Sequence, residues 1–275
     1  MDEFSDPELE ILEAQGLPAL PAAALSGFVK RKGVDLWYAS FGDGPAVLLL
    51  HGGLGNAGNW AYQVPALIDA GYMAIVMDTR AHGRSGWDGS PLSYWQLAGD
   101  AVAVLDALRV DRAAVIGWSD GADTGLVLAI EHPERLSGLV FFACNVDPSG
   151  VLPFVMRPII GRIYARHVAD YSALSPNPDR FGDFEAAVQL MQRSEPNLGA
   201  ADLGAVRVPV LSLIGEHDEF IAEAHARYIA DAIPGALFRQ MRGLSHFAPL
   251  QRPGQFNDVI LAFLAETVAG PLSAQ

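Results

Sequence analysis

The chain of 275 residues is long enough to bury one sizeable core, and an α/β domain of this length need not divide. Hydrophobic residues make up 51% of the chain, charged residues make up 18%, and the formal net charge is −14. Because an acidic surface repels phosphate backbones and anionic lipids, we expect neither a nucleic-acid partner nor a membrane partner.

Several local features favour a cytoplasmic protein. The N-terminus is acidic and lacks the basic and then apolar order of a secretory signal peptide. The one cysteine, Cys144, lies in an apolar run, which favours a buried thiol over a disulfide or a nucleophile. No uncharged apolar stretch is long enough to span a bilayer. Residues 1–26 are interpreted as an N-terminal extension, with a short helix expected over residues 7–15.

Apolar runs that predict strands alternate with amphipathic stretches that predict helices. Strands are expected as a pair within residues 28–41 and then at residues 46–50, 73–78, 113–116, 139–144, 208–214 and 237–241. Helices are expected at residues 64–70, 223–233 and 253–268. Two more helices are expected, one that follows a capping box at residues 93–96 and one that follows Ser119 and extends to Glu131. This alternation is typical of a mainly parallel sheet of about eight strands with helices on both faces.

The alternation stops after Cys144 and returns near residue 201. The intervening residues 145–200 hold six of the 18 prolines together with scattered apolar side chains. We interpret this segment as a helical cap insert that lies over the sheet. Residues 27–144 and 201–275 then form one α/β core.

The stretch Ala113–Gly121 combines an apolar strand, a Gly-x-Ser-x-Gly turn and a small-residue helix. This is the layout of a nucleophile elbow, which holds a serine at a strained strand-to-helix turn. Gly117 and Gly121 lack the Cβ atoms that would collide in such a turn. In this geometry the backbone N–H of Asp120 points to the place where an acyl oxyanion forms beside Ser119.

A serine nucleophile needs a base, and a histidine base needs a carboxylate that orients it. Parallel sheets supply such groups from loops at the carboxyl ends of their strands. Asp218 follows the strand expected at residues 208–214, and His246 follows the strand expected at residues 237–241. Ser119, Asp218 and His246 therefore occur in the chain order expected for this elbow.

Over residues 27–268 the chain resembles the α/β-hydrolase superfamily. The matching motifs are, in chain order, His51-Gly52-Gly53, Asp78-x-Arg80-x-His82-Gly83-x-Ser85, Gly117-Trp118-Ser119-Asp120-Gly121, Gly215-x-x-Asp218 and Ser245-His246. The resemblance implies a serine hydrolase that cleaves carboxylic esters through an acyl-enzyme, with no cofactor and no metal. Superfamily members that hydrolyse epoxides or haloalkanes place an aspartate at the elbow, and the serine here argues against both activities.

The resemblance also implies roles for individual residues. Ser119 is the nucleophile, His246 is the general base and then the general acid, and Asp218 holds the imidazole. The oxyanion hole is expected from the backbone N–H groups of Gly53 and Asp120. The expected substrate is a small, partly apolar ester, and three further residues are expected to line its pocket: Leu54, Trp118 and Phe247.

Some of these assignments have alternatives. Asp147, Glu216 or Glu219 could take the place of Asp218 as the acid of the triad. The elbow also resembles that of valacyclovir-hydrolase-like enzymes, so Asp120 either recognises the α-amino group of amino-acid esters or satisfies the dipole of its helix. The same triad would also serve lactones, thioesters, amides or the cleavage of C–C bonds.

The remaining polar motif residues are interpreted as structural. His51 is expected to brace the oxyanion loop through hydrogen bonds. Asp78, Arg80 and His82 lack the paired spacing of metal ligands and are expected to hold their loop in shape.

A rival hypothesis from another class is a dinucleotide-binding oxidoreductase. Gly53–Gly58 matches G-x-G-x-x-G directly after a strand, and Asp78 ends the next strand 20 positions after Gly58. However, Pro65 predicts a helix that starts too late to receive a pyrophosphate. Neither Lys30 nor Lys32 completes a Tyr-x-x-x-Lys pair. The hydrolase is preferred over this rival and over a protein of the same fold that binds a small molecule without turnover.

Overall fold

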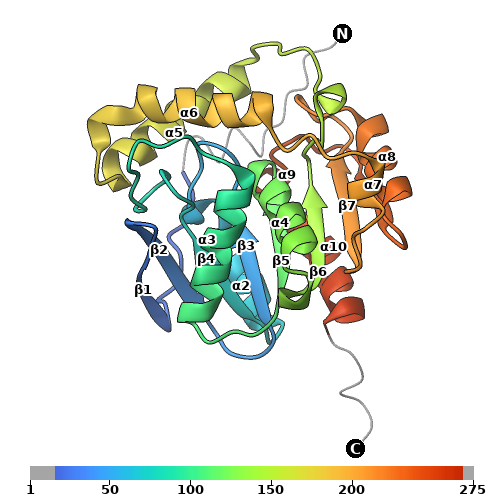
Figure 1. The fold of residues 1–275 in the computed structure, drawn as a ribbon, viewed down its shortest axis with the longest axis horizontal. Coiled ribbons are helices and arrows are strands. Elements are labelled where there is room, and N and C mark those ends of the chain that lie inside the picture. Colours follow the sequence, from blue (N-terminus) through green and yellow to red (C-terminus); the bar gives the residue numbers. More distant parts are fainter. Residues whose placement is uncertain (1–15, 269–275) are drawn as a thin grey trace, which may run out of the picture.

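The computed structural model describes residues 16–268, and the helix expected over residues 7–15 lies outside them. An eight-stranded sheet forms the centre of the molecule, with strand order β1-β2-β4-β3-β5-β6-β7-β8 (Figure 1). The strands are β1 (Leu25–Arg31), β2 (Val34–Phe41), β3 (Ala46–Leu50), β4 (Met73–Met77), β5 (Ala113–Trp118), β6 (Leu136–Phe142), β7 (Val210–Gly215) and β8 (Leu237–Met241).

The helices connect these strands and cover the sheet. The α-helices are α2 (Gln63–Asp69), α3 (Tyr94–Ala107), α4 (Asp120–Glu131), α5 (Pro158–Leu174), α6 (Phe181–Ser194), α7 (Ala200–Leu203), α8 (Glu223–Ala232), α9 (Ala248–Gln251) and α10 (Pro253–Thr267). Short 3-10 helices are η1 (Ala57–Trp60), η2 (Pro133–Arg135), η3 (Pro148–Gly150) and η4 (Pro178–Arg180).

The sheet is mainly parallel. Strands β1 and β2 pair antiparallel, as do β2 and β4, whereas the six strands from β4 to β8 in the sheet order pair in parallel. The parallel strands therefore end at one common edge, where the loops after β3, β5, β7 and β8 meet. This arrangement confirms the predicted fold class.

The apolar runs of the central strands bury side chains on both faces of the sheet. Leu48 and Leu50 of β3 pack in one core with residues of α3 and α4, whereas Val47 and Leu49 pack in a second core with residues of α2 and α10. All four side chains are fully buried. Successive side chains on a strand point to opposite faces, so a continuous apolar run is what a sheet covered by helices on both sides requires.

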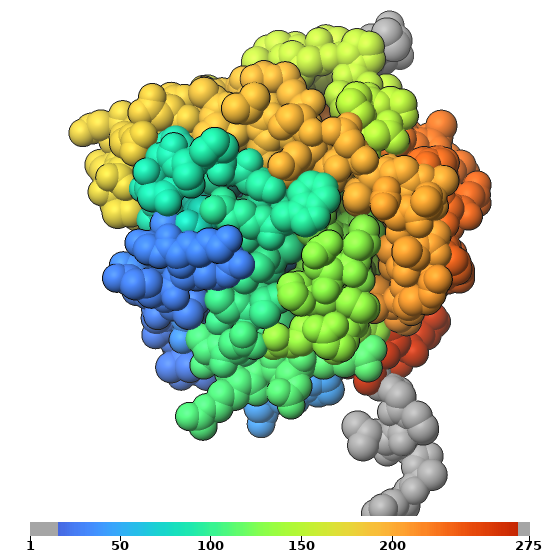
Figure 2. All heavy atoms as spheres, in the orientation of Figure 1, coloured from blue at the N-terminus to red at the C-terminus, as the bar shows by residue number. Residues whose placement is uncertain are grey.

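Helices α5 and α6 fall within the segment expected to form the cap. Figure 1 shows both helices lying across one end of the sheet, and Figure 2 shows their side chains covering that end of the molecule. Aromatic packing joins the two helices to each other, since the rings of Tyr171 and Phe184 stack with their centroids 4.8 Å apart. Phe184, Val188 and Met191 of α6 belong to the core that contains α3 and α4.

Two predictions about local structure are wrong. The strand expected at residues 139–144 begins at Leu136, because pairing between β5 and β6 already starts with Ala113 and Leu136. The predicted capping box is absent, since Ser93 makes no side-chain cap hydrogen bond. Instead, Glu195, which follows α6, accepts a hydrogen bond from the backbone N–H of Tyr94 at 2.9 Å. A carboxylate from the cap segment thus satisfies the N-terminus of α3.

Candidate active site

Ser119 occupies the tight turn between β5 and α4. Its backbone has φ 54° and ψ −125°, a conformation that residues with a side chain rarely adopt. The turn is held on both sides, because the Ser119 N–H donates to the carbonyl of Phe142 at 2.9 Å and the N–H of Ala122 donates to the carbonyl of Ser119 at 2.6 Å. The side chain is half-buried and faces a cavity. These features are those expected of a nucleophile elbow.

The glycines around the serine are required by close backbone contacts. A Cβ atom on Gly117 would collide with the backbone of Gly121 and Ala122, and a Cβ atom on Gly121 would collide with the carbonyl of Leu50. The first turn of α4 therefore packs directly against the ends of β5 and β3. This contact brings the loop after β3 next to the serine.

Asp218 and His246 meet above the same edge of the sheet. The Nδ1 atom of His246 lies 3.0 Å from Oδ2 and 3.2 Å from Oδ1 of Asp218. Asp218 is itself held in place, because its Oδ1 accepts hydrogen bonds from the backbone N–H groups of Phe220 and Ile221. The side chains are 2% and 7% exposed, so the pair is almost completely removed from solvent.

The other acids considered from the sequence contact different groups. Glu219 accepts a hydrogen bond from the backbone N–H of His246 at 3.0 Å, and Glu216 accepts one from the backbone N–H of Gly243 at 2.8 Å. Asp147 accepts from the backbone N–H of Ser149 at 2.8 Å. None of the three is hydrogen-bonded to the His246 ring in the described part of the chain, which leaves Asp218 as the carboxylate that orients it.

The surroundings of His246 favour its protonated form. Burial opposes protonation of the imidazole, but the charge and hydrogen bond of Asp218, with smaller contributions from Glu219 and Asp120, outweigh it and raise the pKa of His246 above its ordinary value. The ring is enclosed by aromatic side chains, with centroid distances of 4.7 Å to Phe220 and 5.6 Å to Phe247. A base with a raised pKa accepts a proton from a hydroxyl more readily.

The loop after β3 is braced as predicted. The buried His51 donates from Nδ1 to the carbonyl of Gly52 at 2.8 Å, and its Nε2 accepts from the backbone N–H of Thr79 at 3.1 Å. Gly53, the next residue, lies against the side chains of Asp120 and Gln192, where a Cβ atom would come within 2.6 Å of a carboxylate oxygen and 2.8 Å of the amide nitrogen. Only glycine fits there without displacing the side chain beside Ser119.

The carboxylate of Asp120 takes part in a buried polar network. Its Oδ1 accepts from the hydroxyl of Tyr94 and from Nε2 of Gln192, each at 3.0 Å. Burial raises the pKa of Asp120, although both hydrogen bonds oppose that effect. The side chain is only 6% exposed. These contacts join α3, α4 and the cap helix α6 directly behind the nucleophile.

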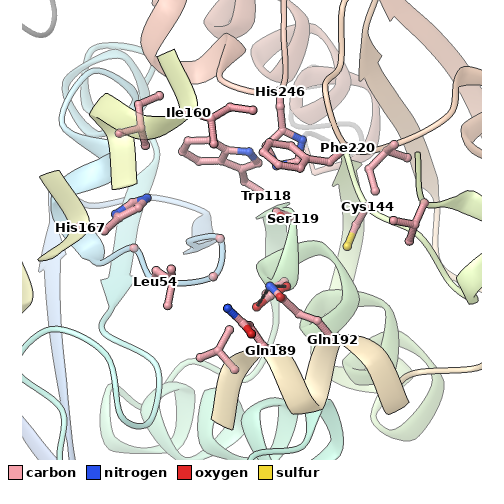
Figure 3. A pocket seen from close by; sticks show the side chains of 18 of the residues that line it. Leu54, Trp118, Ser119, Cys144, Ile160, His167, Gln189, Gln192, Phe220 and His246 are labelled. Carbon is pink, nitrogen blue, oxygen red and sulfur yellow. Dashed lines mark hydrogen bonds between the residues drawn. The ribbon is translucent and has the colours of Figure 1, made fainter. Parts of the chain in front are cut away.

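A cavity of about 770 Å³ lies between the cap and the carboxyl edge of the sheet. Ser119, His246, Gly53 and Asp120 line it, and so do the three residues expected in the pocket, namely Leu54, Trp118 and Phe247. Figure 3 shows Ile160, Trp118 and Phe220 on one side of the cavity and Gln189 and Gln192 on the other. This volume suits a small organic substrate.

The sequence reasoning missed the lining residues that the cap contributes. Helix α5 presents Ile160, Ile163, Tyr164 and His167 to the cavity, and helix α6 presents Glu185, Val188, Gln189, Gln192 and Arg193. Both sets follow the spacing of one helical face. That spacing was visible in the sequence, but it does not say which face of a helix turns toward a cavity.

The dinucleotide-binding hypothesis is not favoured. Asp78, which would have to bind a ribose, is fully buried and accepts from the backbone N–H groups of Ala57 and Arg84 at 2.7 and 2.8 Å. Helix α2 begins only at Gln63, well after the glycine-rich segment. Asp78 therefore ties two loops together, which agrees with the structural role predicted for it.

The described residues 16–268 contain no group of three or more His, Cys, Asp or Glu side chains arranged to bind a metal ion. Among their helices, none has the length and apolar composition that crossing a membrane would demand.

Comparison with known proteins agrees with this geometry. The alpha/beta hydrolase fold family matches residues 45–180. A rhodomycin D methylesterase of a Streptomyces species (strain C5) is 30% identical in an alignment that covers 81% of this chain and 92% of that protein. The chain belongs to the α/β-hydrolase superfamily.

Other proteins similar to this α/β-hydrolase are described as hydrolases of different bonds. A putative carbamate hydrolase of Azorhizobium caulinodans is 28% identical, with 84% of this chain and 96% of that protein aligned. A solved structure described as an N-acyl homoserine lactone degrading enzyme is 28% identical, with a TM-score of 0.69, and covers 86% of this chain and all of that chain. An enol-lactonase from Burkholderia xenovorans LB400 shares the fold at 22% identity, with a TM-score of 0.73 over 87% of this chain and 100% of that one. The chain is accordingly a hydrolase, and the descriptions of the similar proteins name different substrates.

Proposed function

We propose that this hydrolase cleaves carboxylic esters of small, partly apolar substrates through an acyl-enzyme intermediate. The main support is that His246, which is paired with the buried Asp218, and Ser119 in its strained turn line the same cavity. An imidazole held by a carboxylate beside a serine at an elbow is the arrangement that activates a hydroxyl for attack on a carbonyl.

In this proposal the proton of the Ser119 hydroxyl passes to Nε2 of His246 as Oγ bonds to the ester carbonyl carbon. The carbonyl oxygen becomes negative and accepts hydrogen bonds from the backbone N–H groups of Gly53 and Asp120. His246 then gives the proton to the leaving alcohol as the C–O bond breaks. A water molecule, deprotonated by His246, attacks the acyl-serine and releases the carboxylic acid, and the proton returns to Ser119. Asp218 keeps the imidazole oriented throughout and stabilises its positive charge.

The first test uses a fluorophosphonate probe and a 4-nitrophenyl ester. We expect the probe to label Ser119, located by peptide mass spectrometry, and we expect Ser119→Ala to lower kcat by about 10⁶-fold while the fold is retained. The exposed Ser149 offers a matched control, because Ser149→Ala should change neither labelling nor turnover. A Ser119→Ala enzyme with near-normal esterase activity would refute the proposal.

The second test identifies the class of bond. A panel should contain 4-nitrophenyl esters of graded chain length, lactones, thioesters, amino-acid esters and a C–C bond substrate. The cavity of about 770 Å³ and its mixture of apolar and polar walls support esters with a medium-length apolar part. The carboxylate of Asp120 is buried and already accepts hydrogen bonds from Tyr94 and Gln192, which supports a role inside the protein more than recognition of an α-amino group.

A further inference from the structure

His167 is a polar group of the cavity that the proposed mechanism does not use. It lies on α5, on the same helical face as Ile160 and Ile163, and all three line the cavity. Figure 3 shows its imidazole directed from α5 toward the open space of the cavity, on the side where Leu54 lies. The ring is half-buried.

The Nδ1 atom of His167 is completely buried and has no hydrogen-bond partner in the described part of the chain. A buried N–H without a partner is rarer and more costly than a buried lone pair without one. We therefore place the proton of the neutral ring on Nε2 and the lone pair on Nδ1. Nε2 is then an N–H donor on the opposite edge of the ring, which a ligand in the cavity can reach.

His167 stays uncharged under ordinary conditions. Burial, together with the neighbouring His51 and Arg166, lowers the pKa of His167 to about 4. A neutral N–H carries no charge that would offset the desolvation of an anionic ligand, so the ligand group it suits best is an uncharged oxygen, such as the carbonyl of a ketone or amide.

We propose that Nε2 of His167 donates a hydrogen bond to an uncharged oxygen of the substrate other than the scissile carbonyl. This inference rests on the proposed ester hydrolysis. Ile160 and Trp118 contact the apolar part of the same molecule. His167 is then a specificity-determining residue, and the preferred substrates are apolar esters with a second, non-scissile carbonyl or ether oxygen.

The test compares 4-nitrophenyl nonanoate with 4-nitrophenyl oxononanoates that carry a ketone at one of carbons 5 to 8. We expect the parent enzyme to prefer one ketone position over the plain ester. His167→Leu should lower kcat/KM for that keto ester by about fivefold to tenfold, through KM, while kcat/KM for plain nonanoate stays within about twofold. His167→Gln, which keeps an N–H donor, should recover most of the loss.

Arg166→Lys provides a control one residue earlier on α5, and it keeps the positive charge that helps to lower the pKa of His167. The Arg166 side chain pairs with Asp170 and is not part of the cavity wall, so this variant should keep the keto preference of the parent. Thermal unfolding of each variant reports whether it is folded.

A parent enzyme without any keto preference, or a preference that survives His167→Leu at every ketone position, would overturn the proposal. Calorimetry can measure the affinity of the same keto and plain esters for Ser119→Ala, with and without the second substitution His167→Leu. This comparison tests the His167 hydrogen bond in the absence of turnover. If the parent hydrolysed none of the esters, the proposed function would fail, and the calorimetric difference would still decide the role of His167.

Discussion

The amide of Gln192 donates from Nε2 to both carboxylate oxygens of Asp120, at 3.0 Å to Oδ1 and 3.1 Å to Oδ2. Gln192 belongs to the cap helix α6, whereas Asp120 directly follows Ser119 and begins α4. The position of the cap is thus tied to the residue whose backbone N–H is proposed to hold the oxyanion. Tyr94 supplies the second donor from α3.

Removal of the Gln192 amide should destabilise the protein. In Gln192→Leu the Asp120 carboxylate keeps only Tyr94 as a donor, and we expect the free energy of unfolding at pH 7 to fall by about 1–2 kcal/mol, measured by urea denaturation. Burial already raises the pKa of Asp120, and the variant should raise it further. Because a protonated Asp120 needs the donor less, the loss should shrink as the pH falls.

Gln189 provides the control for this prediction, one turn earlier on the same helix. It is exposed and donates to Glu185 rather than to a buried acid. Gln189→Leu should therefore change the free energy of unfolding by less than about 0.5 kcal/mol. Equal losses in the two variants would show that Gln192 has no special role.

The pH dependence of hydrolysis should report on His246. Its neutral form is the base, so kcat/KM should rise with pH through the pKa of His246, which Asp218 raises above the 6.5 of an ordinary imidazole. In Asp218→Asn the carboxylate charge is lost, the pKa of His246 falls, and the acid limb of the profile should move to lower pH. We expect kcat to fall by about 10⁴-fold as well, because the imidazolium loses its stabilising partner.

Glu219→Gln separates a local charge effect from the role of Asp218. Glu219 contacts the backbone N–H of His246, not its ring, so this variant should lower kcat by less than about tenfold and shift the acid limb only slightly. An Asp218→Asn enzyme with an unchanged acid limb would contradict the assignment of Asp218. The raised pKa also implies that the His246–Asp218 pair contributes stability below the pKa of a free imidazole, and that this stability is lost as the pH rises through the pKa of the folded state.

The buried ion pair between Arg80 and Asp100 should be important for stability. Both side chains are fully buried, and Arg80 contacts the two carboxylate oxygens at 2.9 Å each. Arg80→Met leaves Asp100 with Arg31 as its remaining cation, at 2.7 Å. We expect the free energy of unfolding to fall by about 3 kcal/mol, because a buried charge loses most of its compensation.

Arg84 is the matched comparison. It pairs with the equally buried Asp78 at 2.8 Å, but its own side chain is 31% exposed. Asp78 also keeps the backbone N–H donors of Ala57 and Arg84. Arg84→Met should therefore cost only about 1 kcal/mol in a urea titration. A larger loss for Arg84→Met than for Arg80→Met would contradict this reasoning.

Much of the fold was predictable because its signals are local. Apolar runs predicted the central strands β3 to β7, since a strand buried on both faces must be apolar along its length. The Gly-x-Ser-x-Gly turn predicted the position of Ser119, because only glycine fits where Gly117 and Gly121 contact the backbone of neighbouring segments. The capping box at Ser93 failed because a carboxylate far away in the chain, Glu195, satisfies the helix end instead.

The sequence by itself determined the fold class, the elbow and the order of the three residues proposed for catalysis, because these depend on residue type and short spacing. Only the tertiary structure decided that Asp218, among four candidate acids, meets the ring of His246, and that Gln192 and His167 of the cap face the cavity. The physical reason is that a hydrogen bond acts over about 3 Å. Which distant side chains come within that reach depends on how helices and loops pack, and no local pattern in the chain records it.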